Sequence, residues 1–259
     1  MHIALLSDIH GNSIALDAVL ADALRGARGN VDAYWFLGDY AALGYDPVGV
    51  LERIIKLPNA IFIRGNTEHY VVTGQRPAPI VEQVQANPRL LDKFTEVTNS
   101  FAWTQGAVTI GGWWDWLEAL PIEQRLTLPD STRWLGAHAS PGTCDGSGLR
   151  PDMSDEDIQS LVAGCKADLV CVGHTHWPMD RQVGRARIVN LGSVSNPLAP
   201  DLRACYVMLE ADERGYRIEH RRVDYDREAA IAAVRQVRYP GVHHVLSYLT
   251  GQQRPPWEK

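Results

Sequence analysis

Cysteine is scarce in this sequence, and no two cysteines are spaced as a metal-binding or redox pair. Only four of the 259 residues are cysteine, and none of them forms a C-x-x-C motif: Cys144, Cys165, Cys171 and Cys205. So few cysteines in a chain of this length are not typical of a disulfide-stabilised secreted protein. We therefore expect four reduced thiols and a cytoplasmic protein.

Long apolar runs and an excess of basic charge are also missing. No stretch approaches the roughly 18 apolar residues that span a membrane. The apolar run at the N-terminus ends at Asp8, too early for a secretory signal. With 25 basic and 31 acidic side chains, the formal net charge is -6 and the pI is about 5.8. We expect neither a membrane nor duplex nucleic acid as a partner.

The remaining composition is that of a globular protein, with 45% apolar and 22% charged residues. No repeat, low-complexity tract or linker marks a boundary. We predict one domain over residues 1–259, with a helical, aromatic-rich insertion at about 76–120. Elsewhere short apolar runs alternate with helical segments, which predicts an α/β fold whose sheets are covered by helices.

Polar side chains directly follow five predicted buried strands, at residues 2–7, 33–37, 60–63, 134–136 and 168–172. In chain order they are Asp8 and His10, then Asp39, Asn66, His138, and finally His174 and His176. In open α/β sheets, ligands bind outside the carboxyl ends of the strands. Carboxylates, an amide and imidazoles without thiolate suit manganese, iron, zinc or nickel. Seven ligands suffice for two such ions.

Taken singly, these residues have plainer interpretations. Asp8-Ile9-His10 is more often a turn or a helix cap, and His138 alone is more often a core histidine. Gly38-Asp39 and Gly65-Asn66 are common turn dipeptides. Gly173-His174-Thr175-His176 is a stronger signal, because alternate residues that leave a strand point to one side. The shared position after a buried strand favours a common metal site.

Five segments together resemble the motifs of the calcineurin-like metallophosphoesterase superfamily, in particular its bacterial stand-alone branch. They are Ser7-Asp8-Ile9-His10, Gly38-Asp39, Gly65-Asn66-x-Glu68, Gly136-x-His138 and Gly173-His174-Thr175-His176. The resemblance implies a four-layer α/β/β/α sandwich with a two-metal site at the strand ends. In this scheme Asp8, His10, Asp39 and His176 hold the first ion. Asp39 is shared, and it holds the second ion with Asn66, His138 and His174. Two divalent cations are expected, manganese first, with iron, zinc or nickel as alternatives.

The implied activity is hydrolysis of a phosphate mono- or diester by in-line attack of a hydroxide that bridges the metals. Two cations about 3.5–4 Å apart can hold the attacking and leaving oxygens and lower the pKa of a bridging water. The expected substrate is a small phosphorylated molecule, with nucleotides and dinucleoside polyphosphates as candidates. Two alternatives stay open: a weak or inactive protein of this fold that acts as a binding or regulatory module, and a nuclease. The complete ligand set favours the enzyme.

The sequence departs from the family pattern at the general acid. The motif usually has a histidine directly after its asparagine, and Thr67 stands in that place here. Either His69 or a metal-bound water then supplies the proton, or His69 is simply a surface residue at a helix start. Predicted catalytic residues are Asp39, Asn66 and His69; predicted substrate contacts are Arg64 and Asn66, with Arg76 and Arg150 as weaker candidates.

Four tryptophans of the insertion have two interpretations. Trp103, Trp113, Trp114 and Trp116 can stack on a nucleobase as a lid. The preferred interpretation is that Trp113 and Trp116 pack with Leu117 as the inner face of a helix. The remaining histidines are predicted to be structural or surface residues: His2, His220, His243 and His244. After a helix at about 227–237, the C-terminal tail is expected to be loose.

Overall fold

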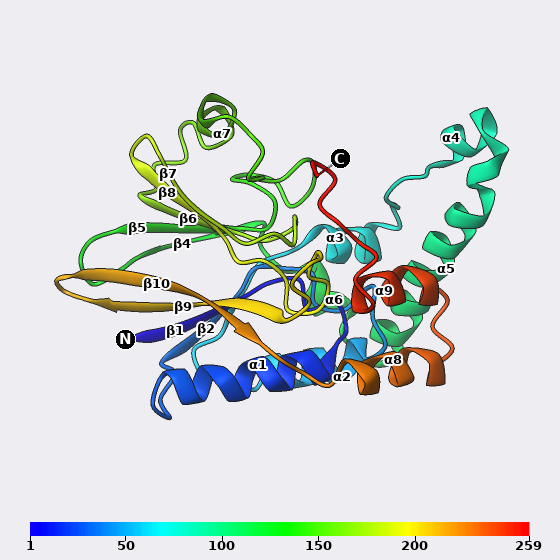
Figure 1. Cartoon of the computed structure of the whole chain (residues 1–259), viewed down its shortest axis with the longest axis horizontal. Coiled ribbons are helices and arrows are strands. Elements are labelled where there is room, and N and C mark those ends of the chain that lie inside the picture. The colour runs from blue at the N-terminus through cyan, green and yellow to red at the C-terminus, as the bar shows by residue number, and fades with distance from the viewer. Residues whose placement is uncertain (259) are drawn as a thin grey trace.

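Two five-stranded β-sheets lie face to face with helices on their outer sides in the computed structural model, which describes residues 1–258 (Figure 1). The first sheet has the order β10 (Gly215–Val223), β9 (Ala204–Asp212), β1 (His2–Leu6), β2 (Ala33–Phe36) and β3 (Ile61–Phe62). The second has the order β4 (Glu123–Thr127), β5 (Arg133–Ala137), β6 (Leu169–Val172), β8 (Ala186–Asn190) and β7 (Met179–Val183). Strands β1, β2 and β3 run parallel, as do β5, β6 and β8.

The helices complete the four layers of the predicted α/β/β/α sandwich, which is confirmed. Helices α1 (Ser13–Gly26), α2 (Pro47–Ile54) and α8 (Arg227–Gln236) lie below the first sheet in Figure 1, and α7 (Asp155–Leu161) lies above the second. The other helices gather at one end of the sheets: α3 (Asn66–Thr73), α4 (Val81–Ala86), the 3-10 turn Pro88–Leu90, α5 (Leu91–Ile110), α6 (Trp114–Glu118) and α9 (Val242–Leu249).

Strand β1 shows how the layers follow from the sequence. Its side chains point alternately to the two faces of the sheet. Ile3 and Leu5 pack between the sheets, whereas Ala4 and Leu6 pack against the helices, and all four are fully buried. Both faces of this strand are therefore covered, which explains its continuous apolar sequence.

Side-chain caps begin three helices of the outer layers. The Asn12 side chain accepts a hydrogen bond from Ala15 N at 3.0 Å, and the Ser154 hydroxyl accepts one from Asp157 N at 3.1 Å. Asp46 caps α2 directly before Pro47. Such caps satisfy backbone donors that have no partner inside the helix.

The aromatic segment packs on the core, as the preferred interpretation predicted. The Trp116 ring lies 5.1 Å from that of Phe62 and 5.7 Å from that of Trp113, and Leu117 is fully buried. Trp103 packs edge-on against Tyr239, with ring centroids 5.1 Å apart.

One expectation for local structure was wrong, and one strand was not predicted. The tail after residue 237 was expected to be loose, but Val242–Leu249 forms α9, whose Val245 and Leu249 are 3% exposed. Their spacing, continued from Val242, places them on one helix face. Strand β7 was not predicted, because its inner residues Asp180, Arg181 and Gln182 are polar; this edge strand pairs with β8.

All four cysteines are buried and free. No helix within residues 1–258 is both long and apolar enough to cross a bilayer.

Replacing Trp134 with Ala tests the packing between the sheets. Trp134 is 1% exposed, and its ring lies 4.3 Å from that of Trp35 on the opposite sheet. We expect the free energy of unfolding to fall by about 3–5 kcal/mol in urea denaturation, because the deletion leaves a cavity. The control Ile110→Ala, at a side chain that is 91% exposed, should change stability by less than about 0.5 kcal/mol. Equal effects of the two substitutions would contradict this role.

Candidate metal centre

The seven predicted ligands lie where the parallel strands end. Asp8 and His10 follow β1, Asp39 follows β2, Asn66 begins α3 after β3, His138 follows β5, and His174 and His176 follow β6. The carboxyl ends of these strands meet at one edge of the two sheets, so residues far apart in the sequence come together. Asp8, His10, Asp39 and His138 are at most 2% exposed.

One half of the centre consists of Asp8, His10 and His176. The Nε2 atoms of the two histidines are only 3.1 Å apart. Oδ1 of Asp8 lies 3.2 Å from Nε2 of His176 and 3.8 Å from Nε2 of His10. The three side chains are thus close enough to coordinate one ion.

The other half consists of Asn66, His138 and His174, with Asp39 beside them. Oδ1 of Asn66 lies 3.0 Å from Nε2 of His138 and 2.9 Å from Nδ1 of His174. Oδ1 of Asp39 lies 3.4 Å from Nε2 of His138. These atoms form a second group of potential ligands next to the first.

Both carboxylates lie between the two halves. Oδ2 of Asp39 is 3.8 Å from Nε2 of His10, so its two oxygens face different halves. Asp8 also belongs to a group with Asp39 and His138, since its Oδ1 lies 3.9 Å from Nε2 of His138. Asp8 is therefore a second candidate for the shared ligand, besides Asp39.

Hydrogen bonds fix the ring nitrogens that face the centre. Nδ1 of His10, His138 and His176 donates to the carbonyl oxygens of Ala42 (3.0 Å), Leu37 (2.6 Å) and Asn196 (2.9 Å). A carbonyl oxygen only accepts, so Nδ1 carries the proton and Nε2 of the neutral ring presents a lone pair. In His174 the arrangement is reversed, because Nε2 contacts the Gly146 carbonyl at 2.9 Å and Nδ1 faces inward. Lone pairs thus converge on one place, as in a metal centre.

The Asp8 side chain gives a direct test of whether a cation fits. Its Oδ2 accepts a hydrogen bond from His174 N at 3.0 Å, but the buried Oδ1 has no hydrogen-bond partner among residues 1–258. A buried, unpartnered carboxylate oxygen is costly. Because Oδ1 faces His10 and His176, a divalent cation between them satisfies all three groups.

Charge effects favour a positive ion in the same place. Burial raises the pKa of Asp39, but His138 and His10 outweigh it and bring the pKa well below its ordinary value. Burial opposes protonation of His138, yet Asp39 and Asp8 raise its pKa to about 10. For His10 burial prevails and lowers the pKa to about 4. Both carboxylates are thus ionised, and metal ions compete with the protons on the imidazoles.

The backbone at these positions is unusual. Five of the seven residues have positive φ angles, between 46° and 68°: Asp8, His10, Asp39, His174 and His176. Residues other than glycine rarely adopt this left-handed conformation, and it is typical of functional sites. It lets each chain segment turn sharply after its strand, so that the side chain points into the centre.

Comparison with known proteins decides the family. A sequence model described as calcineurin-like phosphoesterase matches residues 1–178. The chain belongs to the calcineurin-like phosphoesterase family. Its buried aspartate and histidine clusters are compatible with divalent metal binding in such a protein.

Relatives extend over nearly the whole length of this chain. It is 28% identical over 257 residues to an uncharacterized protein of Methanocaldococcus jannaschii, which covers 92% of this chain and 93% of the relative. A hypothetical protein of Pyrococcus horikoshii has a similar fold, with a TM-score of 0.78, 21% identity, and coverage of 96% and 97%. A metallophosphoesterase of Sphaerobacter thermophilus has a TM-score of 0.73, 24% identity, and coverage of 97% and 98%.

Thr67 and Glu68, the two residues after Asn66 on α3, form hydrogen bonds that hold the ligand segments in place. The carboxylate of Glu68 accepts hydrogen bonds from the backbone nitrogens of Asp39 (2.7 Å), Tyr40 (2.8 Å) and Gly65 (3.0 Å). Burial, followed by the nearby Asp39, raises the pKa of Glu68 to about 7. Thr67 donates from its hydroxyl to Oδ1 of Asp39 at 2.9 Å. Glu68 therefore joins the chain segments after β2 and β3, a role that the sequence analysis missed.

Other predicted site residues are engaged with the protein itself. The ring of His69 contacts Oε1 of Gln75 at 3.1 Å. The Arg64 guanidinium donates to the carbonyl of Glu118. Arg76 donates to the carbonyl of Tyr70 and to Gln105, and Arg150 pairs with Asp152 at 2.8 Å. The roles predicted for these residues in catalysis and substrate binding stay predictions.

Two cavities adjoin the centre. One, of about 250 Å³, includes Asn66 and Thr67 in its wall and extends between α3, α5 and α9. The other, of about 390 Å³, includes His174 and His176 together with Arg150 and Arg254. Substrate can thus reach the predicted ligands from two directions.

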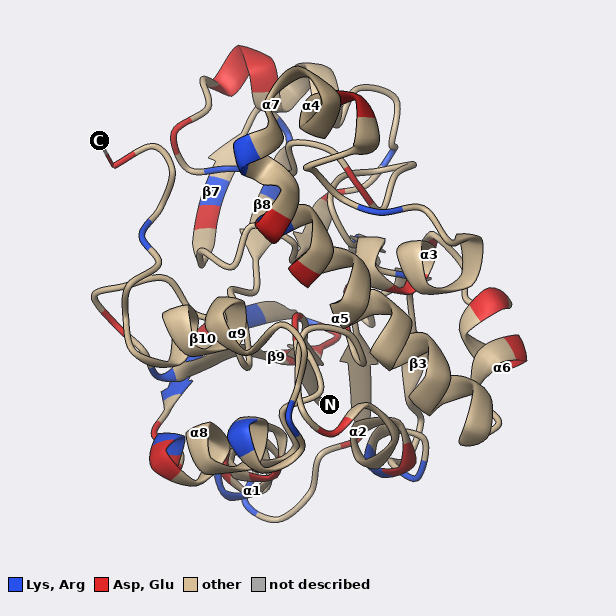
Figure 2. Ribbon diagram, turned by 90° about the vertical axis from the view of Figure 1, so that its right-hand side faces the viewer, with Lys and Arg blue, Asp and Glu red and all other residues tan. Residues whose placement is uncertain are grey.

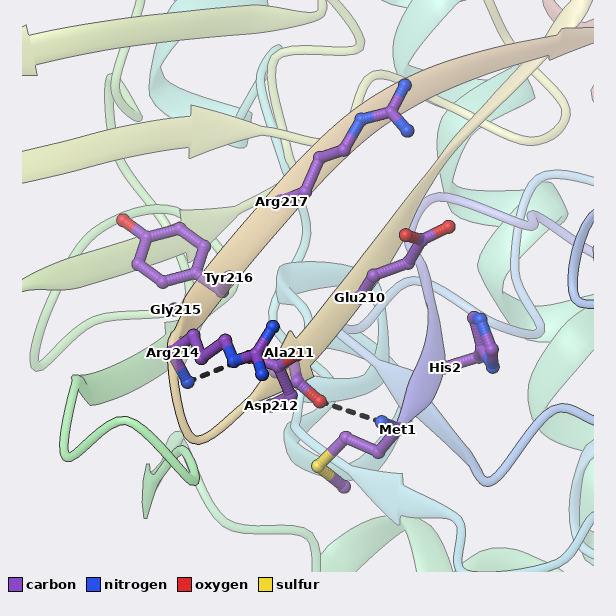
Figure 3. Close-up of a pocket in the computed structure, with 9 residues that line it drawn as sticks. All are labelled: Met1, His2, Glu210, Ala211, Asp212, Arg214, Gly215, Tyr216 and Arg217. Atoms are coloured by element: carbon purple, nitrogen blue, oxygen red, sulfur yellow. Dashed lines mark hydrogen bonds between the residues drawn. The ribbon is translucent and has the colours of Figure 1, made fainter.

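A third cavity, of about 490 Å³, lies far from this centre (Figure 3). It is formed by the N-terminus and the turn between β9 and β10, where Met1 N donates to the Ala211 carbonyl at 2.7 Å. Because β1 runs from His2 to Leu6, Met1 and Asp8 lie at opposite ends of this strand. Figure 3 shows none of the predicted ligands in this cavity.

Metal analysis of a His176→Ala variant tests the division into two halves. We expect wild-type protein loaded with Mn²⁺ and desalted to hold two ions per chain by elemental analysis. The variant should hold about one, because the half with Asp8 and His10 loses an imidazole. His243→Ala serves as control, since that side chain is 89% exposed. Unchanged metal content in His176→Ala would rule out this ligand.

Replacing Glu68 with Gln tests the support of Asp39. A Gln side chain has a single acceptor oxygen and cannot accept all three backbone N–H groups. We expect the affinity for Mn²⁺, measured by calorimetry, to fall by about 10–100-fold, the usual effect of removing a group that orients a ligand. The exposed Glu52→Gln substitution controls for loss of one negative charge. Equal affinities of the two variants would show that Glu68 does not position Asp39.

Proposed function

We propose that this phosphoesterase hydrolyses a phosphate mono- or diester with two divalent cations, Mn²⁺ first among them, held by the seven residues of the centre. The observation that carries the proposal is that the unpartnered Oδ1 of Asp8 and the Nε2 atoms of His10 and His176 face the same place. When bound, the cations would supply positive charge to the attacking and leaving oxygens and lower the pKa of the attacking water.

The chain's own residues set the charge of the site. Asp8 and Asp39 contribute one negative charge each, whereas Asn66 and the neutral imidazoles contribute none. Two divalent ions therefore retain a net positive charge, which attracts a phosphate anion. Asp39, whose oxygens face both halves, would hold the ions at a fixed separation. Asn66 adjoins both the centre and a cavity, which suits a residue that orients the substrate phosphate.

The two adjoining cavities support a small phosphorylated substrate, with a nucleotide among the candidates. Their volumes of about 250 and 390 Å³ suit an organic group of modest size. The complete ligand set favours hydrolysis over a function in binding alone. The four free, buried cysteines are in keeping with a reducing compartment such as the cytoplasm.

One candidate for the proton donor, suggested by the sequence, is His69. It lies on α3 three residues after Asn66, and its ring is hydrogen-bonded to Gln75. Comparing a benzyl ester with a nitrophenyl ester in a His69→Gln variant tests this role directly.

A substrate panel after chelation tests the proposed activity. We expect chelation to abolish hydrolysis of p-nitrophenyl phosphate or bis-p-nitrophenyl phosphate and added Mn²⁺ to restore it. Asp39→Asn should lower kcat/KM by more than about 100-fold, because residues that merely support a ligand already contribute about 10–100-fold. Full activity after chelation, or none with any of Mn²⁺, Fe²⁺, Zn²⁺ and Ni²⁺, would contradict the proposal.

A further inference from the structure

The cavity beside Asn66 is formed by segments that are distant in the sequence. Helix α3 contributes Asn66, Thr67 and Tyr70. In the turned view, α5 crosses the molecule between α9 and α3 (Figure 2). Helix α5 contributes Lys93, Glu96, Val97, Ser100 and Phe101, and α9 contributes His244. The cavity therefore leads from the metal centre to the space between these helices.

Beyond Asn66 and Thr67, much of the cavity wall is apolar. It includes Leu43, Val97 and the rings of Tyr70 and Phe101, which pack edge-on with centroids 5.7 Å apart. The Tyr70 hydroxyl already donates to Asp145, so this ring offers the cavity mainly its apolar surface. Apolar walls with a few polar groups are typical of sites for organic ligands. An apolar or aromatic group fits such a wall better than a sugar or a second phosphate.

Thr67 cannot act as proton donor at the inner end of this cavity. Its hydroxyl hydrogen is directed to Oδ1 of Asp39 at 2.9 Å, and the residue is 2% exposed. An aliphatic hydroxyl is also a far weaker acid than an imidazolium. Departure of a basic alkoxide therefore needs a proton from another source, and the candidates are a metal-bound water, His69 and a further group in the cavity wall.

His244 contributes an imidazole to this wall, and its ring nitrogens are available to bind a ligand. Its backbone nitrogen donates to Oε1 of Glu96 at 3.3 Å, but neither ring nitrogen has a hydrogen-bond partner within residues 1–258. The ring packs against Tyr248, 5.3 Å between centroids, and Tyr248 in turn packs against His176 at 5.7 Å. His244 thus lies one ring away from a predicted metal ligand.

Charges around His244 come from α5 and from the segment after β6. Burial lowers its pKa below the ordinary value, Glu96 of α5 opposes this shift, and His176 and Lys93 add to it. An imidazolium with a lowered pKa gives up its proton more readily. A phosphate anion at the centre acts in the same direction as Glu96 and favours the protonated ring.

We propose that this cavity binds the apolar or aromatic alcohol part of the phosphoester and that His244 donates the proton to the departing oxygen. The inference rests on the proposed phosphoesterase activity and specifies its substrate class. Water oxygen bonds to phosphorus while the bond between phosphorus and the alcohol oxygen breaks. The departing oxygen keeps the electron pair and takes the proton from His244. The proton lost by the attacking water returns the ring to its protonated form.

A comparison of two leaving groups tests the role of His244. Benzyl phosphate and p-nitrophenyl phosphate, or their methyl diesters, both place one aromatic ring in the cavity. Nitrophenolate departs without a proton, whereas benzyl alkoxide needs one. For His244→Gln we expect kcat on the benzyl ester to fall by about 100-fold or more. On the nitrophenyl ester kcat should stay within about threefold, because general acid catalysis contributes little to a good leaving group.

Two further histidine variants complete the experiment. His243→Gln, the exposed neighbour on α9, should leave both rates unchanged. A selective loss on the benzyl ester in His69→Gln, but not in His244→Gln, would assign the proton to His69 and overturn the proposal. Equal losses on both esters in His244→Gln would also overturn it. Metal-dependent nitrophenyl hydrolysis in the wild type and an unchanged Tm of each variant separate these outcomes from misfolding and from failure of the proposed function.

Filling the cavity tests its occupant separately. We expect Val97→Trp to weaken inhibition by benzylphosphonate at least tenfold, because the larger side chain takes the space of the ring. Inhibition by inorganic phosphate should stay unchanged, since the phosphate lies at the centre. Equal changes for both inhibitors, or none for benzylphosphonate, would show that the alcohol group lies elsewhere.

Discussion

Two buried carboxylates surrounded by imidazoles impose the main constraint on this molecule. Asp8 and Asp39 are at most 2% exposed, and water cannot stabilise their charge. Positive charge must therefore lie among them, as metal ions or as protons on His138 and His176. The hydrogen bonds from Nδ1 to backbone carbonyls already orient the rings for a metal. The fold thus orients these ligands through its own hydrogen bonds.

The sandwich makes this arrangement possible because both sheets end at the same place. Each ligand follows a parallel strand, and left-handed backbone angles turn the chain directly after β1, β2 and β6. Glu68 joins two of these segments by accepting backbone hydrogen bonds on both sides. The contacts that hold the centre are therefore mostly between backbone and side chain, and they tie it to the β-sheet core.

The grouping of the seven predicted ligands at one edge of the sheets was largely predictable from the sequence, because these residues occur in motifs next to buried strands. Each motif depends on local order, which a single sequence shows. The proximity of Asp8 to both halves was not predictable, since it depends on the packing of two sheets. His244 was predicted to be a structural or surface residue for a related reason. It lies in no motif, and its helix belongs to a tail whose packing became evident only from contacts with α5.

The predicted ligands and the cavity wall belong to different segments of the chain, and this separation matters for the evolution of substrate preference. Strand ends hold the predicted ligands, while α5 and α9 form much of the cavity wall. Helix α5 extends away from the sheets, so substitutions along it can reshape the wall without moving a ligand (Figure 1). New substrate preferences can thus arise on an unaltered reactive core.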